Sequence, residues 1–192
     1  MAAGKKTKKS ATKSKKSARQ NVAAESGEAD IIELILTDHE PLKELIEILK
    51  DTENDLEERR DAFEQFGPLL VSHAKTEENI LYEYLKEDED LREEGFEGDV
   101  EHQLADQMLE EAKRTDDEDL WSARVKVLAE LVEHHIEEEE EEMLPEFKKH
   151  SEKEDRIELG AAFTKLKNKI ESEGLDDISA KKFAEAHERV SH

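Results

Sequence analysis

The sequence predicts an all-α protein, namely an antiparallel up-and-down four-helix bundle with an additional C-terminal helix and a disordered basic N-terminal tail. Charged residues make up 43% of the 192 residues, and only seven Gly and three Pro are present, which is too few turn residues for an all-β fold. Apolar residues recur at steps of three and four in segments joined by short polar connectors, and this pattern favours a helical bundle.

Residues 1–28 are predicted to form the disordered tail. Its first twenty residues carry eight Lys and Arg and no acid, and subtracting these eight from the formal net charge of −24 leaves −32 for the remainder. Such a tail has no apolar face to bury. It is suited to weak nucleic-acid contact through displaced counterions, although a solubilising role is the simpler interpretation and the acidic remainder would repel DNA.

The first predicted helix runs from about Asp30 to Lys50 and the second from about Leu56 to Glu87. Each has an apolar stripe with helical spacing. Pro68 removes a backbone donor from the second segment, so we expect a kink or a fresh helix start near Gly67.

A break at Gly95 and Gly98 separates the third predicted helix, about Asp99 to Arg114, from the second. The fourth is predicted from about Leu120 to Lys149, after a run of acidic residues that can cap its N-terminus. The bundle itself is thus expected to occupy residues 29–150.

Residues 151–192 are predicted to contain a fifth amphipathic helix, about Asp155 to Ser172, which either docks on the bundle or projects as an arm. The tail beyond it, with Lys181, Lys182 and His187, has few apolar anchors and is expected to be frayed.

The composition also restricts the chemistry. The chain has no Cys, which excludes disulfides, thiolate metal sites and cysteine nucleophiles. No apolar run approaches the length of a membrane span, and the basic start is not followed by the apolar stretch of a secretory signal, so we expect a cytoplasmic protein without a membrane partner.

Four histidines fall on the apolar stripes, one on each predicted bundle helix: His39, His73, His102 and His135. The intervals between them are 34, 29 and 33 residues, each about one helix and one loop. In an antiparallel bundle this regular spacing can bring the four imidazoles to one level.

Three of these histidines have an acidic residue four positions later, namely Glu77, Asp106 and Glu139. Residues four apart lie on one helix face, so both side chains can reach the same metal pair. Acids are 53 of the 192 residues, and each pair alone is therefore weak support. Glu77 and Glu139, however, also lie on the apolar stripe, where an unpartnered carboxylate is costly. We interpret the pattern as a metal site rather than a set of core histidines.

Imidazole and carboxylate ligands suit iron, manganese or zinc. The chain lacks the Glu-x-x-His pairs of ferritin-like di-iron proteins and the His-Glu-x-x-His helix of zinc proteases. A site rich in imidazole favours ferrous iron, and an unfilled coordination position there could bind dioxygen, nitric oxide or peroxide.

The segments "TDHEPLKELI", "SHAKTEENILYEYL", "VEHQLADQMLEE" and "EHHIEEEEEEMLPEF" resemble the hemerythrin-like HHE cation-binding domain over about residues 30–150. The resemblance implies a four-helix bundle with two non-haem irons and two bridging carboxylates. The metal ligands it implies are His39, His73, Glu77 and His102 from the first three helices, and His135 and Glu139 from the fourth.

Some assignments stay open at this stage. Oxygen-carrying hemerythrins have a His at the place of Asp106, and their spacing would choose Glu140 over Glu139. His134 is a register alternative to His135 but lies off the stripe.

The leading functional prediction is a di-iron protein that binds or senses dioxygen, nitric oxide or related oxidants. The alternatives are a protein of iron or redox homeostasis, scavenging iron or acting like a peroxidase, and a metal-free interaction bundle with a nucleic-acid-binding tail. Neither an enzymatic activity nor an oligomeric state follows from the sequence.

Overall fold

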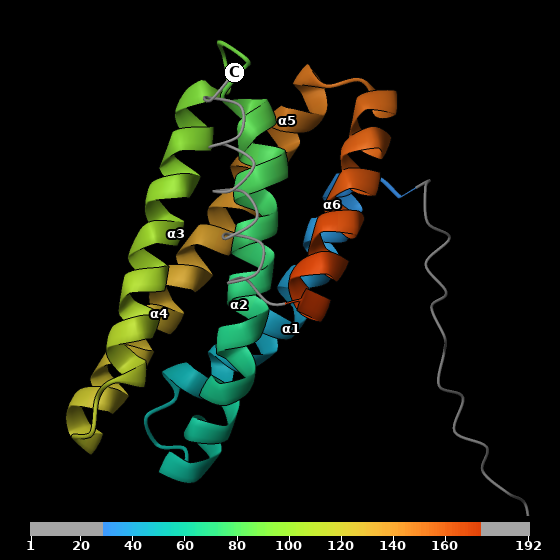
Figure 1. Ribbon diagram of the computed structural model, residues 1–192. Coiled ribbons are helices and arrows are strands. Elements are labelled where there is room, and N and C mark those ends of the chain that lie inside the picture. The colour runs from blue at the N-terminus through green and yellow to red at the C-terminus, as the bar shows by residue number, and fades with distance from the viewer. Residues whose placement is uncertain (1–28, 174–192) are drawn as a thin grey trace, which may run out of the picture.

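The computed structural model describes residues 29–173, and every regular element in that range is helical (Figure 1). The all-α prediction is therefore confirmed, while both predicted tails lie largely outside the described residues. In chain order the elements are α1 (Ile31–Lys50), α2 (Leu56–Leu85), α3 (Arg92–Lys113), α4 (Glu118–Glu138), the π-helical turn η1 (Glu139–Met143), α5 (Leu144–His150) and α6 (Lys153–Glu173).

Aspartate side chains fix the starts of three helices. Asp30 accepts a hydrogen bond from the backbone N–H of Ile32 at 3.0 Å, and Asp55 accepts one from Glu57 at 2.9 Å. Asp117 caps α4 in the same way. Such caps satisfy N–H groups that have no partner within the helix, and a cap typically contributes about 1 kcal/mol.

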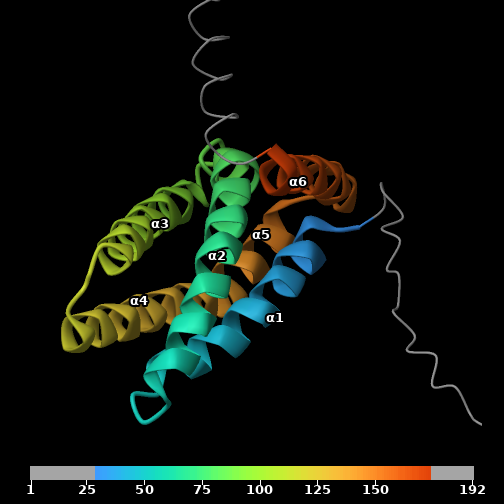
Figure 2. The same ribbon diagram turned by 60° about the horizontal axis from the view of Figure 1, so that its bottom comes forward.

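The four long helices surround one interior. α1 packs against α2 and α4, and α3 packs against the same two helices (Figure 2). α6 lies outside this ring on α1 and α2, so the predicted fifth segment docks and does not project as an arm. Across residues 29–173, no helix is both long and apolar enough to cross a membrane.

The apolar core is divided into two clusters. One includes Leu42, Phe66, Leu109, Trp121 and Val132, and the other includes Ile31, Leu81, Leu85, Phe147 and Phe163. On α1 and α2, the buried residues between the two sets are mostly polar. The interior therefore contains a polar layer with an apolar cluster on either side.

No fresh helix starts near Gly67, because α2 is one continuous helix through Pro68. Pro68 has no N–H group to donate to the backbone carbonyl of Glu64, four residues earlier. Both residues lie on the exposed side of the helix. Water can hydrate that carbonyl, which removes much of the cost of an internal proline.

The third helix begins at Arg92, earlier than predicted, and the two glycines read as a break lie inside it and are buried. A Cβ atom at Gly98 would lie 2.6 Å from Cζ of Tyr82, and one at Gly95 would lie 3.1 Å from Cβ of Leu85. These glycines therefore mark a close approach of α3 to α2 and not a turn.

The fourth predicted helix is divided. α4 ends at Glu138, a π-helical turn follows, and α5 carries the chain on to His150. A π-turn accommodates an extra residue and is frequent at functional sites. Here Glu139 and Met143 of this turn are both buried.

We expect the two helical glycines Gly67 and Gly160 to respond differently to alanine. A Cβ at Gly67 would lie 3.4 Å from Leu109 Cδ1, an ordinary contact, and Pro68 offsets the helix propensity that alanine adds, so Gly67→Ala should change the stability by less than about 1 kcal/mol. At Gly160 it would collide with the backbone carbonyl of Ala29, so Gly160→Ala should destabilise the packing of α6 on α1. Urea unfolding of both variants would test this, and equal midpoints would contradict it.

Candidate metal centre

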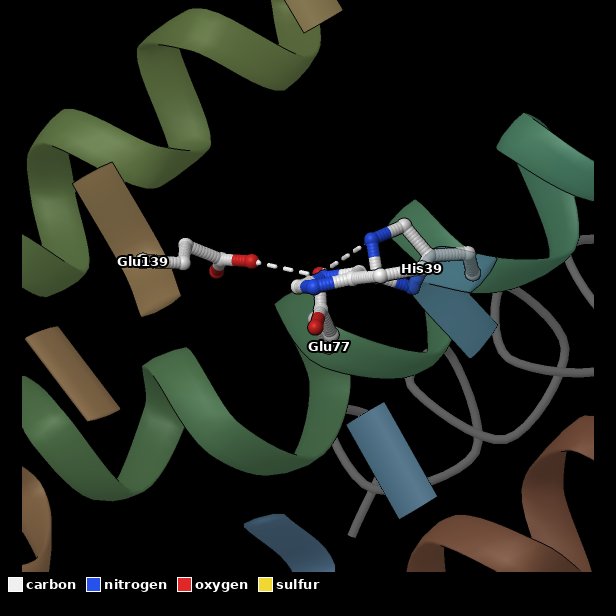
Figure 3. A group of neighbouring side chains, drawn as sticks. His39, Glu77 and Glu139 are labelled. Carbon is white, nitrogen blue, oxygen red and sulfur yellow. Dashed lines mark ion pairs between the residues drawn. The ribbon is translucent and has the colours of Figure 1, made fainter. Parts of the chain in front are cut away.

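The structure places the six residues singled out as ligands side by side in the polar layer. The exposed fraction of each is 4% or less. Figure 3 shows His39, Glu77 and Glu139 converging on one volume from α1, α2 and the π-turn. The complete set is His39, His73, Glu77, His102, His135 and Glu139.

One group of potential ligand atoms comes from His39, His73, Glu77 and Glu139, with all four atoms within 4.8 Å of one another. Nε2 of His39 lies 3.2 Å from Oε2 of Glu139, and Nε2 of His73 lies 3.1 Å from Oε2 of Glu77. Two imidazoles and two carboxylates thus face a common point.

A second group of three potential ligand atoms, also within 4.8 Å of one another, comes from Glu77, His102 and His135. The Nε2 atoms of the two histidines are 2.9 Å apart. Oε2 of Glu77 lies 3.7 Å from Nε2 of His102, and Oε2 of Glu139 lies 3.7 Å from Nε2 of His135. Because Glu77 belongs to both groups, the two positions are adjacent.

The outward-facing Nδ1 atoms of three of these imidazoles lie near other carboxylates. Such contacts fix the ring orientation and leave Nε2 directed to the interior, as in many metal sites. The pairs are His39 with Glu140 at 2.8 Å, His135 with Glu101 at 2.6 Å and, less closely, His102 with Glu78 at 3.6 Å.

The structure separates the two candidate glutamates of the π-turn. Glu139 is fully buried in the polar layer, whereas Glu140 lies at its edge, bonded to Lys43 Nζ at 2.5 Å and to the outer nitrogen of His39. His134, the register alternative to His135, has a side chain 64% exposed and is paired with Glu138.

Asp106 does not enter the site, although its position four residues after His102 made it a candidate to reach the same metal pair. Its side chain is partly exposed and accepts a hydrogen bond from Lys75 Nζ at 2.6 Å. The four-residue spacing after His102 puts it on a neighbouring face, where a lysine is available as partner. The exposed group Asp88, Asp90 and His150 lies elsewhere and resembles ordinary surface acids.

Several buried atoms of the polar layer have no hydrogen-bond partner among the described residues. They include both oxygens of Glu77, Oε2 of Glu139, Nε2 of His39 and both nitrogens of His73. Leaving a buried polar group unsatisfied costs about 1–3 kcal/mol, and more for a charged one. A cation between these atoms would satisfy most of them at once, so the residues fit a metal.

The two buried carboxyl groups differ in their electrostatics. Burial and the nearby charge of Glu139 raise the pKa of Glu77 well above its ordinary value. Burial also opposes ionisation of Glu139, but the nearby imidazoles of His135 and His39 outweigh it and lower the pKa of Glu139. Without metal, Glu77 is thus the carboxyl that holds a proton.

The buried imidazoles also differ in the direction in which their pKa is shifted. Burial lowers the pKa of both His73 and His102, so these rings are neutral and able to ligate. At His135 burial is outweighed by Glu139 and Glu101, and the pKa is raised. Metal at this ring must therefore compete with a proton.

Sequence reasoning missed one buried polar group of the site, Tyr82. Its hydroxyl donates a hydrogen bond to Oε1 of Glu139 at 2.7 Å and lies 3.4 Å from His102 Nε2 and 3.3 Å from His135 Nε2. Burial raises the pKa of this phenol well above 10.0. A tyrosine in an apolar helix is usually core, so the residue pattern carried no signal of this role.

A buried set of four imidazoles and two carboxylates, enclosed by helices, is typical of helical domains that bind non-haem metals. The family model described as "Hemerythrin HHE cation binding domain" matches residues 30–147. The chain therefore belongs to the hemerythrin HHE cation-binding domain family. No curated protein and no solved structure matches the chain.

His135 and His134 are adjacent and form a matched pair for testing the site. His135→Ala should remove most bound metal, because it deletes one of the inward-facing nitrogens of the second donor group. His134→Ala should leave the iron content unchanged, because that ring is exposed. Iron analysis after gel filtration would measure both, and equal losses would contradict the assignment.

Proposed function

We propose that this chain is a non-haem di-iron protein that binds dioxygen, nitric oxide or a related oxidant. The proposal depends above all on the two adjacent groups of buried donor atoms that share Glu77. A single metal position would leave either His39 with His73 or His102 with His135 without a ligand role.

In this proposal His39 and His73 would hold one iron, His102 and His135 would hold the other, and Glu77 and Glu139 would serve both. The irons would supply the redox and small-molecule-binding chemistry. The protein would keep His73 and His102 neutral and orient the rings, and the two apolar clusters would keep bulk water from the layer.

We also propose the antiparallel up-and-down course of the four helices. It is supported by the composition of the core clusters. Leu49 near the end of α1 shares a cluster with Phe63 in the first half of α2, and Leu109 near the end of α3 shares it with Trp121 near the start of α4.

Iron is favoured over other metals by the chemistry of the donors. Neutral imidazoles with two carboxylates suit ferrous iron, manganese and zinc, and the chain offers no thiolate. Zinc has no redox chemistry, whereas non-haem iron combines one-electron redox changes with the binding of dioxygen or nitric oxide.

The two alternatives have less support. A role in iron or redox homeostasis would be favoured by a more carboxylate-rich centre, but the carboxylate of Asp106 is hydrogen-bonded to Lys75. A metal-free bundle would leave the unsatisfied atoms of Glu77 and His73 without compensation. The lysine-rich tail and its nucleic-acid contact lie outside the described residues.

Anaerobic loading with ferrous iron followed by air tests the proposal. We expect two irons per chain and an optical absorption that appears with air and reverses under inert gas. An irreversible change would favour the iron or redox homeostasis alternative. A plateau at one iron, or none, would contradict the di-iron centre.

A further inference from the structure

The phenol of Tyr82 lies inside the polar layer and beside its second group of donors. It comes from α2, five residues beyond Glu77, and its side chain is fully buried. We propose that Tyr82 supplies its phenol oxygen as a ligand to the metal ion held by His102 and His135. This inference rests on the proposed metal centre and adds a donor to it.

The distances between the phenol oxygen and the two imidazole nitrogens support ligation by Tyr82. Metal–ligand bonds of about 2.1 Å place neighbouring ligands of one ion roughly 3.0–3.4 Å apart. The Tyr82 oxygen lies 3.3 Å from Nε2 of His135 and 3.4 Å from Nε2 of His102, and these two nitrogens are 2.9 Å apart. The three atoms thus already have the mutual spacing of ligands on one ion.

The backbone of α3 holds the phenol in this place. The ring lies against Gly98, where a Cβ atom would approach Cζ to 2.6 Å and the phenol oxygen to 2.9 Å. The ring is also packed against that of His102, with centroids 5.2 Å apart. Any larger residue at position 98 would displace the phenol from the two imidazoles.

Ligation is a simple exchange at the phenol oxygen. The O–H bond breaks, an oxygen–metal bond forms from the oxygen lone pair, and the proton leaves to bulk water. No electron is transferred. The anionic oxygen is a hard donor and favours ferric over ferrous iron.

Tyr82 would make the two metal positions unequal. The His102 and His135 position would have five protein donors, because both bridging glutamates and the phenol join the two imidazoles. The His39 and His73 position would have four among the described residues. The exogenous oxidant should therefore bind at the ion held by His39 and His73, where more coordination positions stay open.

The alternative is that Tyr82 has only a structural role in the polar layer. Its hydroxyl donates to Glu139 at 2.7 Å, so the phenol could serve only to solvate that carboxylate. A phenol that only donates a hydrogen bond produces no charge-transfer absorption, whereas a phenolate on ferric iron absorbs visible light. The two roles are therefore separable by spectroscopy.

The chain has two tyrosines, which makes a matched test possible. Tyr84 packs its ring on Phe147 with centroids 5.6 Å apart and has no contact with the donor groups. Wild type, Tyr82→Phe and Tyr84→Phe would be loaded with ferrous iron and oxidised with ferricyanide. Iron content, visible absorption and resonance Raman spectra would then be measured.

We expect tyrosinate Raman modes and a visible band in wild type and Tyr84→Phe, and loss of both in iron-bound Tyr82→Phe. Wild type that holds two irons without these signals would overturn the role of Tyr82 and leave the di-iron centre standing. Wild type that binds no iron would overturn both. A band retained in Tyr82→Phe would also overturn the inference.

A second variant keeps the test valid if Tyr82→Phe does not fold. Gly98→Ala retains the phenol but pushes its ring away from the imidazoles, so the band should weaken or shift. Gly67→Ala is the control, since a Cβ there meets Leu109 at an ordinary 3.4 Å. An unchanged band in Gly98→Ala would contradict ligation.

Discussion

The carboxylate of Glu139 lies at the centre of the bundle among the rings of His39, His135 and Tyr82, and its charge determines how these groups are arranged. The neighbouring imidazoles lower the pKa of Glu139, and the negative charge of Glu139 in turn helps to raise the pKa of Glu77 and of His135. Two buried acids so close together cannot both ionise unless positive charge lies between them. Metal ions would supply that charge.

The rest of the fold tolerates this polar layer because an apolar cluster lies on each side of it. Those clusters stabilise the helices without any contribution from a metal, and the layer itself opposes folding wherever its atoms lack partners. α6 adds to the second cluster through Phe163. The apo protein is therefore expected to fold, with its weakest region at the layer.

Helical periodicity was sufficient to find four histidines and two glutamates, because a charged or polar side chain is conspicuous on an apolar stripe. It could not find Tyr82, whose ring suits an apolar stripe, or Glu101, which is one acid among many. Gly98 was misread as a helix break, and no fresh helix starts at Pro68, since the effect of these residues depends on a neighbouring helix and on solvent exposure. The π-turn at Glu139 likewise had no local signal.

Protons and metal ions compete for the same atoms of this layer, so proton release during zinc titration tests the account most directly. Raised pKa values for Glu77 and His135 mean that metal must displace protons, and metal affinity should rise with pH. In weakly buffered solution near neutral pH, wild type should release protons, and Glu77→Gln should release fewer. Zinc binding with equal or no proton release in both proteins would contradict the account.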